Sequence, residues 1–202
     1  SYAHVSTTSY GYDALNRVVQ AIEAYGVAGV QRTTQQAFDA AGELVSVTDG
    51  NGNVTGYGYD ALGRLVQRID GYGSAVASTA TMLYDAADNL LSETTGQSAT
   101  ASYAHVSTTS YGYDALNQLV QQIDGYGTAV ASTATMIYDL AGNLLSETTG
   151  QSTTASYAHV STTSYGYDAL NRVTQVIGGF GTAVAATATL IYDAADNLLS
   201  ET

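Results

Sequence analysis

The chain has 202 residues, with 18 acidic against 5 basic side chains and a formal net charge of −13. This charge argues against nucleic-acid partners, whose phosphates are bound by clustered Lys and Arg, and no apolar run approaches the ~18 residues of a membrane-spanning helix. The absence of Cys, Pro and Trp excludes disulfides, thiolate metal sites and cysteine nucleophiles.

The sequence repeats itself along its whole length. The segment SYAHVSTTSYGYDALN starts at Ser1, Ser102 and Ser156, and its last two copies lie 54 residues apart. An aromatic residue followed by Asp occurs eight times, at Tyr12-Asp13, Phe38-Asp39, Tyr59-Asp60, Tyr84-Asp85, Tyr113-Asp114, Tyr138-Asp139, Tyr167-Asp168 and Tyr192-Asp193. From Tyr59 onward the spacing alternates between 25 and 29 residues, which gives a 54-residue unit. Such periodicity predicts a repeat architecture.

We therefore expect a single continuous array over residues 1–202. Its repeats diverge over 1–56, where Phe38 replaces Tyr and the stretch from Thr48 to Asp60 replaces a longer linker. Repeats 57–110 and 111–164 are almost identical, and 165–202 is an incomplete copy. Because the chain begins and ends within the pattern, we interpret it as a segment of a longer array.

Each repeat predicts a β-hairpin. A β-rich run leads into Tyr-Asp-x-x-[Gly, Asn or Asp], and a second β-rich run follows. Asp is suited to accept a hydrogen bond from the backbone two residues on, and Gly, Asn or Asp supplies the positive φ of a turn followed by a bulge.

Alternation along the strands predicts their faces. In the return strand, Leu65, Gln67 and Ile69 are expected on one face and Val66, Arg68 and Asp70 on the other. Tyr57 and Tyr59 share a face before the turn. Since Tyr57, Tyr111 and Tyr165 occupy equivalent positions, we expect their rings to line up as ladders.

The stretch from Ala75 to Asp85 is rich in Ala, but Val, Thr and Tyr at alternate positions favour a strand. No segment predicts a helix. The expected fold is all-β, built of tandem hairpins.

The units YDALGRLVQRIDGYG (Tyr59 to Gly73) and YDLAGNLLSETTG (Tyr138 to Gly150) resemble the YD repeat of RHS proteins. Asn replaces Gly in YDALN, and Asp-Asn replaces Gly-Arg in YDAADN. The resemblance implies a spiralled sheet (solenoid, tube or shell), as in RHS and Tc-toxin shell proteins, teneurins and bacterial wall-associated repeat proteins. The residues assigned to this structural motif are Tyr12, Asp13, Phe38, Asp39, Tyr59, Asp60, Gly63, Arg64, Tyr84, Asp85, Tyr113, Asp114, Tyr138, Asp139, Gly142, Tyr167, Asp168, Tyr192 and Asp193.

Two sets of residues raise the question of a metal site. His4, His105 and His159 stand in identical contexts and would suit a metal-binding or pH-sensing ladder, but we favour solvated residues copied with the repeat. The clusters Asp85, Asp88, Asn89 and Asp193, Asp196, Asn197 offer oxygen ligands for Ca²⁺, but they match no calcium-loop spacing, and turn capping explains them.

No catalytic motif is present, and a repeated motif would imply a repeated active site, so we expect no enzyme and assign no catalytic, cofactor-binding or metal-binding residue. The Asp-Pro chemistry of self-cleaving RHS proteins is not carried over, because the chain has no Pro.

The leading hypothesis is a structural protein, a secreted or cell-surface filament or tube of bacterial origin that serves as scaffold or adhesive fibre. The second is part of an RHS-type hollow shell that encapsulates a toxin effector, and the third is a carbohydrate-binding surface module. The expected partners are further repeats or copies of the same chain, with glycans or an encapsulated effector as further candidates.

Overall fold

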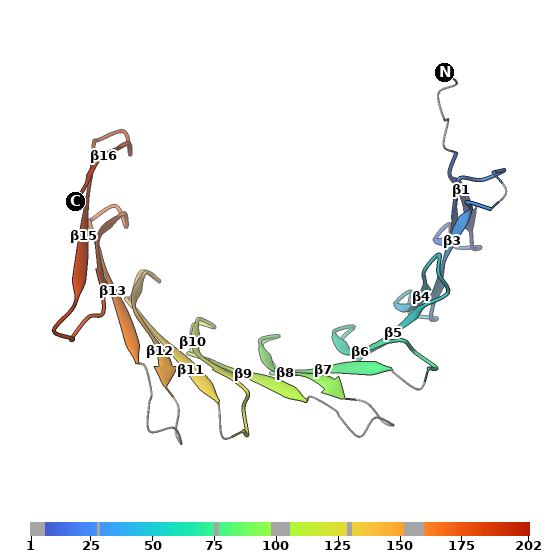
Figure 1. Cartoon of the computed structure of the whole chain (residues 1–202), viewed down its shortest axis with the longest axis horizontal. Helices are drawn as coiled ribbons and strands as arrows, with labels where there is room; N and C mark the ends of the chain where they lie inside the picture. The colour runs from blue at the N-terminus through green and yellow to red at the C-terminus, as the bar shows by residue number, and fades with distance from the viewer. Residues whose placement is uncertain (1–6, 28, 75–76, 98–105, 129–130, 152–159) are drawn as a thin grey trace. The chain divides into compact units, whose positions relative to one another are not determined.

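The computed structural model describes residues 7–27, 29–74, 77–97, 106–128, 131–151 and 160–202. Within these ranges the secondary structure is all β, with no helix. The strands, labelled in Figure 1, are β1 (Ser9–Tyr12), β2 (Val18–Glu23), β3 (Arg32–Phe38), β4 (Leu44–Thr48), β5 (Val54–Tyr59), β6 (Leu65–Asp70), β7 (Ser78–Tyr84), β8 (Leu90–Gln97), β9 (Ser107–Tyr113), β10 (Leu119–Asp124), β11 (Ser132–Tyr138), β12 (Leu144–Gln151), β13 (Ser161–Tyr167), β14 (Val173–Gly178), β15 (Ala186–Tyr192) and β16 (Leu198–Glu201). The all-β expectation is confirmed.

The strands follow one another in the sheet in chain order, from β1 to β16, and the strand pairs with a defined register are antiparallel. The chain divides into two compact units, one comprising residues 1–83 and 93–106 and the other residues 84–92 and 107–202.

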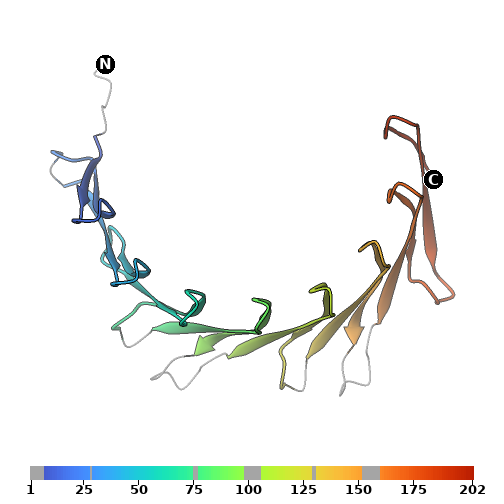
Figure 2. The ribbon, with the colours of Figure 1, turned by 180° about the vertical axis from the view of Figure 1, so that it is seen from behind.

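Because neighbouring strands are antiparallel, successive connections alternate between the two ends of the strands. Within each unit, the connections that contain the Tyr-Asp or Phe-Asp pairs line one edge of the sheet, which we call the turn edge. The remaining connections line the opposite edge. Figures 1 and 2 show the short turns of the turn edge as small hooks that repeat along the ribbon.

In the turn-edge strand pairs that have a defined register, a β-bulge lies next to the turn, as expected. In the pair β5–β6, Tyr59 is opposite Leu65 and Gly58 is opposite Gln67, so the register shifts by one residue. Residues opposite one another share a face, and Tyr59 and Gly58 lie on opposite faces. The prediction that Leu65 shares a face with Gln67 is therefore wrong, because the bulge adds one residue between them.

The expected ladders of equivalent Tyr rings do not form in the second unit. Tyr111 lies on β9 and Tyr165 on β13, with three strands between them. At a strand spacing of ~4.8 Å, the two positions are ~19 Å apart, which is too far for ring contact. The repeat extends within the plane of the sheet, so equivalent residues are separated by the width of four strands.

The strand predicted over 75–85 is confirmed for Ser78–Tyr84, and residues 75–76 lie outside the described ranges. No helix in the described part of the chain is long and apolar enough to cross a membrane.

In the described part of the chain, the sheet is a single layer without a hydrophobic core. No hydrophobic side chain among the described residues is buried, and Gly56 is the one buried residue of any type. Most strand side chains are half-buried on both faces. Hydrogen bonds at the strand ends and contacts between adjacent strands must therefore carry a larger share of the stability than in a globular domain.

Candidate functional site

The turn that follows each Tyr-Asp pair is closed by the Asp carboxylate. In the turn at Asp60, Oδ1 accepts the N–H groups of Leu62 at 2.9 Å and Arg64 at 3.0 Å, and Oδ2 accepts Nε–H of Arg64 at 2.7 Å. The backbone closes the same loop, since Asp60 N–H donates to the Arg64 carbonyl and Gly63 N–H donates to the Asp60 carbonyl, both at 3.0 Å. Counting from Asp, we call Gly63 the third residue of this turn and Arg64 the fourth.

The same carboxylate bond recurs in the other described turns of this edge. In each, Oδ1 of the Asp accepts the N–H of the fourth residue, and these fourth residues are Arg17, Glu43, Arg64, Asn89, Gln118, Asn143, Arg172 and Asn197. The described turns therefore share one closing interaction, whatever the fourth residue is.

The third residue of each turn has a positive φ. Gly occupies this position at Gly42, Gly63 and Gly142, with φ between 77° and 93°. Asn and Asp take it elsewhere, with φ of 60° to 66°, at Asn16, Asp88, Asn117, Asn171 and Asp196. The departures from the Gly-containing motif therefore keep the turn conformation, because Asn and Asp adopt the left-handed region more readily than other side chains.

A further turn of the same kind, which the Tyr-Asp pattern does not predict, joins β4 to β5 on the opposite edge. Asp49 Oδ1 accepts N–H from Asn51 at 2.9 Å and from Asn53 at 2.8 Å, and Oδ2 accepts Nδ2–H of Asn53 at 2.8 Å. Thr48, not an aromatic residue, precedes it. The signal was the spacing Asp-x-x-Gly-Asn, which Asp49 shares with Asp139.

These hydrogen bonds stabilise the charged carboxylates. The bonded N–H of Arg64 holds the pKa of Asp60 below its ordinary value, and Arg172 does the same for Asp168. In the turn at Asp139, the largest lowering of the pKa comes from the amide side chain of Asn143. A lowered pKa means that each carboxylate contributes stability above its unfolded-state pKa, and this stability is lost as the pH falls through the folded-state pKa.

At Tyr59, Tyr113 and Tyr167, the Tyr of the pair connects its hairpin to the preceding one. The Tyr59 hydroxyl donates to the Leu44 carbonyl at 3.0 Å, and Tyr113 and Tyr167 donate to Leu90 and Leu144 at 3.1 and 2.8 Å. Each accepting carbonyl belongs to the residue directly after the preceding turn. Burial raises the pKa of all three tyrosines, so their hydroxyls stay protonated and able to donate.

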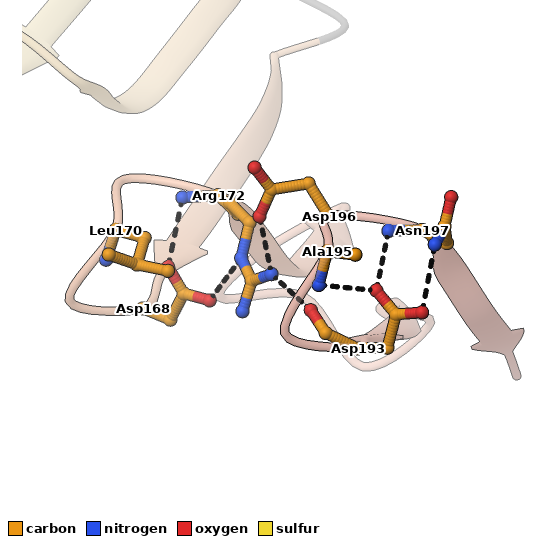
Figure 3. Close-up of polar contacts among 7 residues, drawn as sticks. All are labelled: Asp168, Leu170, Arg172, Asp193, Ala195, Asp196 and Asn197. Carbon is orange, nitrogen blue, oxygen red and sulfur yellow. Dashed lines mark hydrogen bonds and ion pairs between the residues drawn. The ribbon is translucent and has the colours of Figure 1, made fainter.

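The fourth residue connects its hairpin to the following one. Figure 3 shows Arg172, which holds Oδ2 of its own Asp168 through Nε at 2.7 Å and reaches the next turn through Nη1. There Nη1 donates to the Asp193 carbonyl and to Oδ1 of Asp196, both at 2.8 Å. The guanidinium also lies 5.0 Å from the centroid of the Tyr192 ring. At the other end of the chain, Arg17 lies over Phe38 in the same way, at 4.5 Å.

Glu43 is the exception among the fourth residues, because it places a carboxylate where the other turns place Arg, Asn or Gln. Burial raises the pKa of Glu43, and the nearby carboxylates of Asp39 and Asp60 raise it further. At neutral pH the Glu43 carboxylate therefore repels the carboxylates of Asp39 and Asp60, at a position where the other turns have a hydrogen-bond donor.

Among the remaining candidate residues, those that the structure describes take part in the turns. His4, His105 and His159 lie outside the described residues. Asp196 accepts a hydrogen bond from Arg172, and the Asp193 carboxylate accepts the N–H of Ala195 and the amide of Asn197, so these groups serve the turns. Within the described ranges, no three His, Cys, Asp or Glu side chains gather as metal ligands.

The RHS Repeat family model matches the chain at residues 38–75 and 138–183. Both segments begin at the aromatic residue of a turn-edge pair, Phe38 and Tyr138, and they confirm the resemblance to the YD repeat of RHS proteins. No curated protein matches the sequence.

Solved structures share the fold. TcdB2-TccC3-TEV matches with a TM-score of 0.69 at 20% identity, over 95% of this chain and 11% of that chain. TcdB2-TccC3-Cdc42 matches with a TM-score of 0.53 at 18% identity, over 93% and 12%. The Tc holotoxin pore of Photorhabdus luminescens with a TccC3 mutation matches with a TM-score of 0.52 at 16% identity, over 93% and 12%. The chain thus spans only about a tenth of the length of these chains.

Replacement of Asp139 by Ala should open its hairpin. The substitution removes the acceptor of the Ala141 and Asn143 N–H groups and one of the two acceptors of the Asn143 side-chain amide. We expect amide hydrogen exchange at the start of β12 to accelerate by about tenfold. The control is Asp124→Ala, since Asp124 accepts only side-chain donors, from Thr109 and Gln122. Equal acceleration in the two variants would contradict the role of the Asp139 carboxylate.

Replacement of Glu43 by Gln should stabilise the protein at neutral pH. The raised pKa of Glu43 means that its favourable contribution is complete below the unfolded-state pKa and is lost as the pH rises through the folded-state value. Gln has no charge to lose this stability with rising pH, and Gln118 occupies the same position in the turn at Asp114. Thermal melts should show a higher Tm for the variant at pH 7 and a smaller difference at pH 4. A gain of the same size at both values would rule out carboxylate repulsion as its cause.

Proposed function

We propose that this chain, which carries RHS repeats, is a structural wall element of a hollow RHS-type shell that encloses an effector. The observation that supports this most directly is the single-layer sheet, in which side chains of the turn edge connect hairpin to hairpin. A sheet without a core of its own is suited to a wall and offers no enclosed catalytic chamber within one repeat. The likeness of its fold to TcdB2-TccC3-TEV supports the same choice.

A secreted or cell-surface filament is the alternative. Near-identical repeats, as at 57–110 and 111–164, would give a constant rotation and rise per repeat and so a uniform tube or fibre. A closed shell instead needs repeats that differ, and the divergent repeats at 1–56 meet that need. In both cases the partners are further repeats of the same kind, the role is that of a scaffold without catalysis, and the setting is bacterial and extracellular.

Electron microscopy of the protein from its native source separates the two structures. The shell proposal predicts closed particles with density inside the wall. Uniform fibres whose axial repeat follows the 54-residue unit would refute it and support the filament. Closed particles that lack internal density in every image class would support the shell and refute the enclosed effector.

A carbohydrate-binding surface is a second candidate, because exposed aromatic rings recur on the edge opposite the turn edge. The rings are those of Tyr25, Tyr72, Tyr126 and Phe180, each 53–57% exposed. In the first unit, a Cβ placed on Gly56 would lie 3.1 Å from the Tyr72 ring. Ser46, Gly56, Gln67, Ile69 and Tyr72 help to line a cavity of about 290 Å³ beside it. A ring face with a hydroxyl and an amide nearby suits a neutral sugar, and the net charge of −13 disfavours an acidic one.

The carbohydrate proposal predicts saturable binding of a neutral hexasaccharide such as cellohexaose. Replacement of Tyr72 by Ala should remove the chemical-shift changes of Ile69 and Gln67 in an NMR titration, whereas Tyr10→Ala, which removes an exposed Tyr outside the cavity, should leave them unchanged. Shifts that do not saturate, or that persist in the Tyr72 variant, would refute the proposal.

A further inference from the structure

The third and fourth residues of neighbouring turns vary together along the turn edge. In two places the pair is Asn with Asn, where the amide of a fourth residue donates to the side-chain oxygen of the next third residue. Asn89 donates to Asn117 and Asn143 donates to Asn171, both at 2.9 Å. In each case the amide of the fourth residue also holds Oδ2 of its own Asp, at 2.9 Å. One short amide therefore connects two turns.

Where the third residue is Asp, the preceding fourth residue in the second unit is Arg. Nη1 of Arg172 donates to Oδ1 of Asp196 at 2.8 Å, with Arg172 22% exposed and Asp196 71% exposed. The acidic third residue Asp196 thus pairs with a cation. The neutral third residues Asn117 and Asn171 pair with an amide. The exposed carboxylate of Asp196 depends on Arg172 for its ion pair.

Where the third residue is Gly, the preceding fourth residue is long. A Cβ placed on Gly142 would lie 3.2 Å from Nε2 of Gln118, and one on Gly63 would lie 3.0 Å from Oε1 of Glu43. A Cβ on Gly42 would lie 3.7 Å from Nη1 of Arg17. Gly63 and Gly142 therefore do more than permit a positive φ, since the missing side chain leaves room for the long side chain of the preceding turn, whereas a Cβ on Gly42 would make only an ordinary contact.

We propose that the fourth residue of each turn selects the third residue of the next turn, so that the turn edge carries a matching rule between adjacent hairpins. Asn accepts Asn, Gln and Glu accept Gly, and Arg accepts either Asp or Gly. The rule concerns assembly of the array and holds whether the array forms a shell or a filament.

Near-identical repeats have a physical need for such a rule. Strands of the same sequence can pair in the wrong order or with a shifted register at little loss of backbone hydrogen bonding, and domain swapping follows from the same similarity. Neighbouring turns with matched polar groups make the correct order more favourable, and mismatched groups make a wrong neighbour unfavourable. The fourth residue is therefore a specificity-determining residue for hairpin order.

The first test converts a long-with-Gly pair into an Asn-with-Asn pair. Gly142→Asn alone should crowd Gln118, and Gln118→Asn alone should leave an amide too short to reach the next turn. The double variant should rebuild the contact seen between Asn143 and Asn171. The control is Gly52→Asn, because Gly52 has the same φ of +86° as Gly142 but nothing within 4 Å of its Cβ position. This control measures only the free-energy cost of placing Asn at a positive φ.

Hydrogen exchange of the strands on either side of each turn, measured in the full chain, reports the result. We expect Gly142→Asn to accelerate exchange in β11 and β12 by about threefold to tenfold more than Gly52→Asn does in β4 and β5. The added Gln118→Asn should recover most of that difference. If the two substitutions act additively, or if Gly142→Asn costs no more than Gly52→Asn, the rule is wrong.

The second test uses a different pair, so that the inference does not depend on one set of variants. Arg172→Asn should leave Asp196 unmatched and accelerate exchange in β15 and β16. Arg172→Asn with Asp196→Asn forms an Asn-with-Asn pair and should recover most of the loss, whereas Asp196→Asn alone should not stabilise the wild-type background. A double variant that is no better than Arg172→Asn would overturn the rule, because the loss would then come from the other contacts of Arg172, with the Asp193 carbonyl and the Tyr192 ring.

Discussion

The Asp carboxylate of each turn is the interaction on which the rest of this structure depends. A single-layer sheet has no core into which it can bury apolar side chains, so the usual driving force of folding is weak here. Two N–H groups at the end of a hairpin would remain unpaired without an acceptor, as those of Leu170 and Arg172 show. One carboxylate pairs both of them, and its second oxygen remains free to hold the fourth residue.

The contacts of the turn also explain how hairpins are joined into an array. The Tyr hydroxyl reaches back to the carbonyl that follows the previous turn, as Tyr167 does to Leu144. The fourth residue reaches forward, as Arg172 does to Asp196. The hairpin at Asp168 is therefore held from both sides by groups that lie within a few residues of its own Asp. Such an arrangement extends by repetition and needs no packing against a second layer, which suits a wall or a fibre.

The sequence predicted the local features because they depend on few residues. Asp followed by Gly, Asn or Asp three positions later specifies the turn, and the structure has the turns, the positive φ and the bulges expected from it. Features that depend on the register between strands were not predictable. The bulge places Leu65 on a different face from Gln67, and Tyr111 and Tyr165 are separated by three strands. The Tyr59 hydroxyl finds Leu44 only because two hairpins lie side by side. The aromatic-Asp pattern does not predict the turn at Asp49, because Thr48 precedes this Asp.

Amide hydrogen exchange of the unmodified chain tests most directly whether the carboxylates keep the turns closed in solution. The N–H of Leu170 is bonded to the Asp168 carboxylate although it lies in an exposed turn. We expect this amide, and that of Arg172, to exchange nearly as slowly as the amides of the adjacent strands at neutral pH, and their protection to fall when the carboxylate is protonated. Exchange of these amides at the rate of an unstructured peptide at neutral pH would show that the carboxylate does not keep the turn closed.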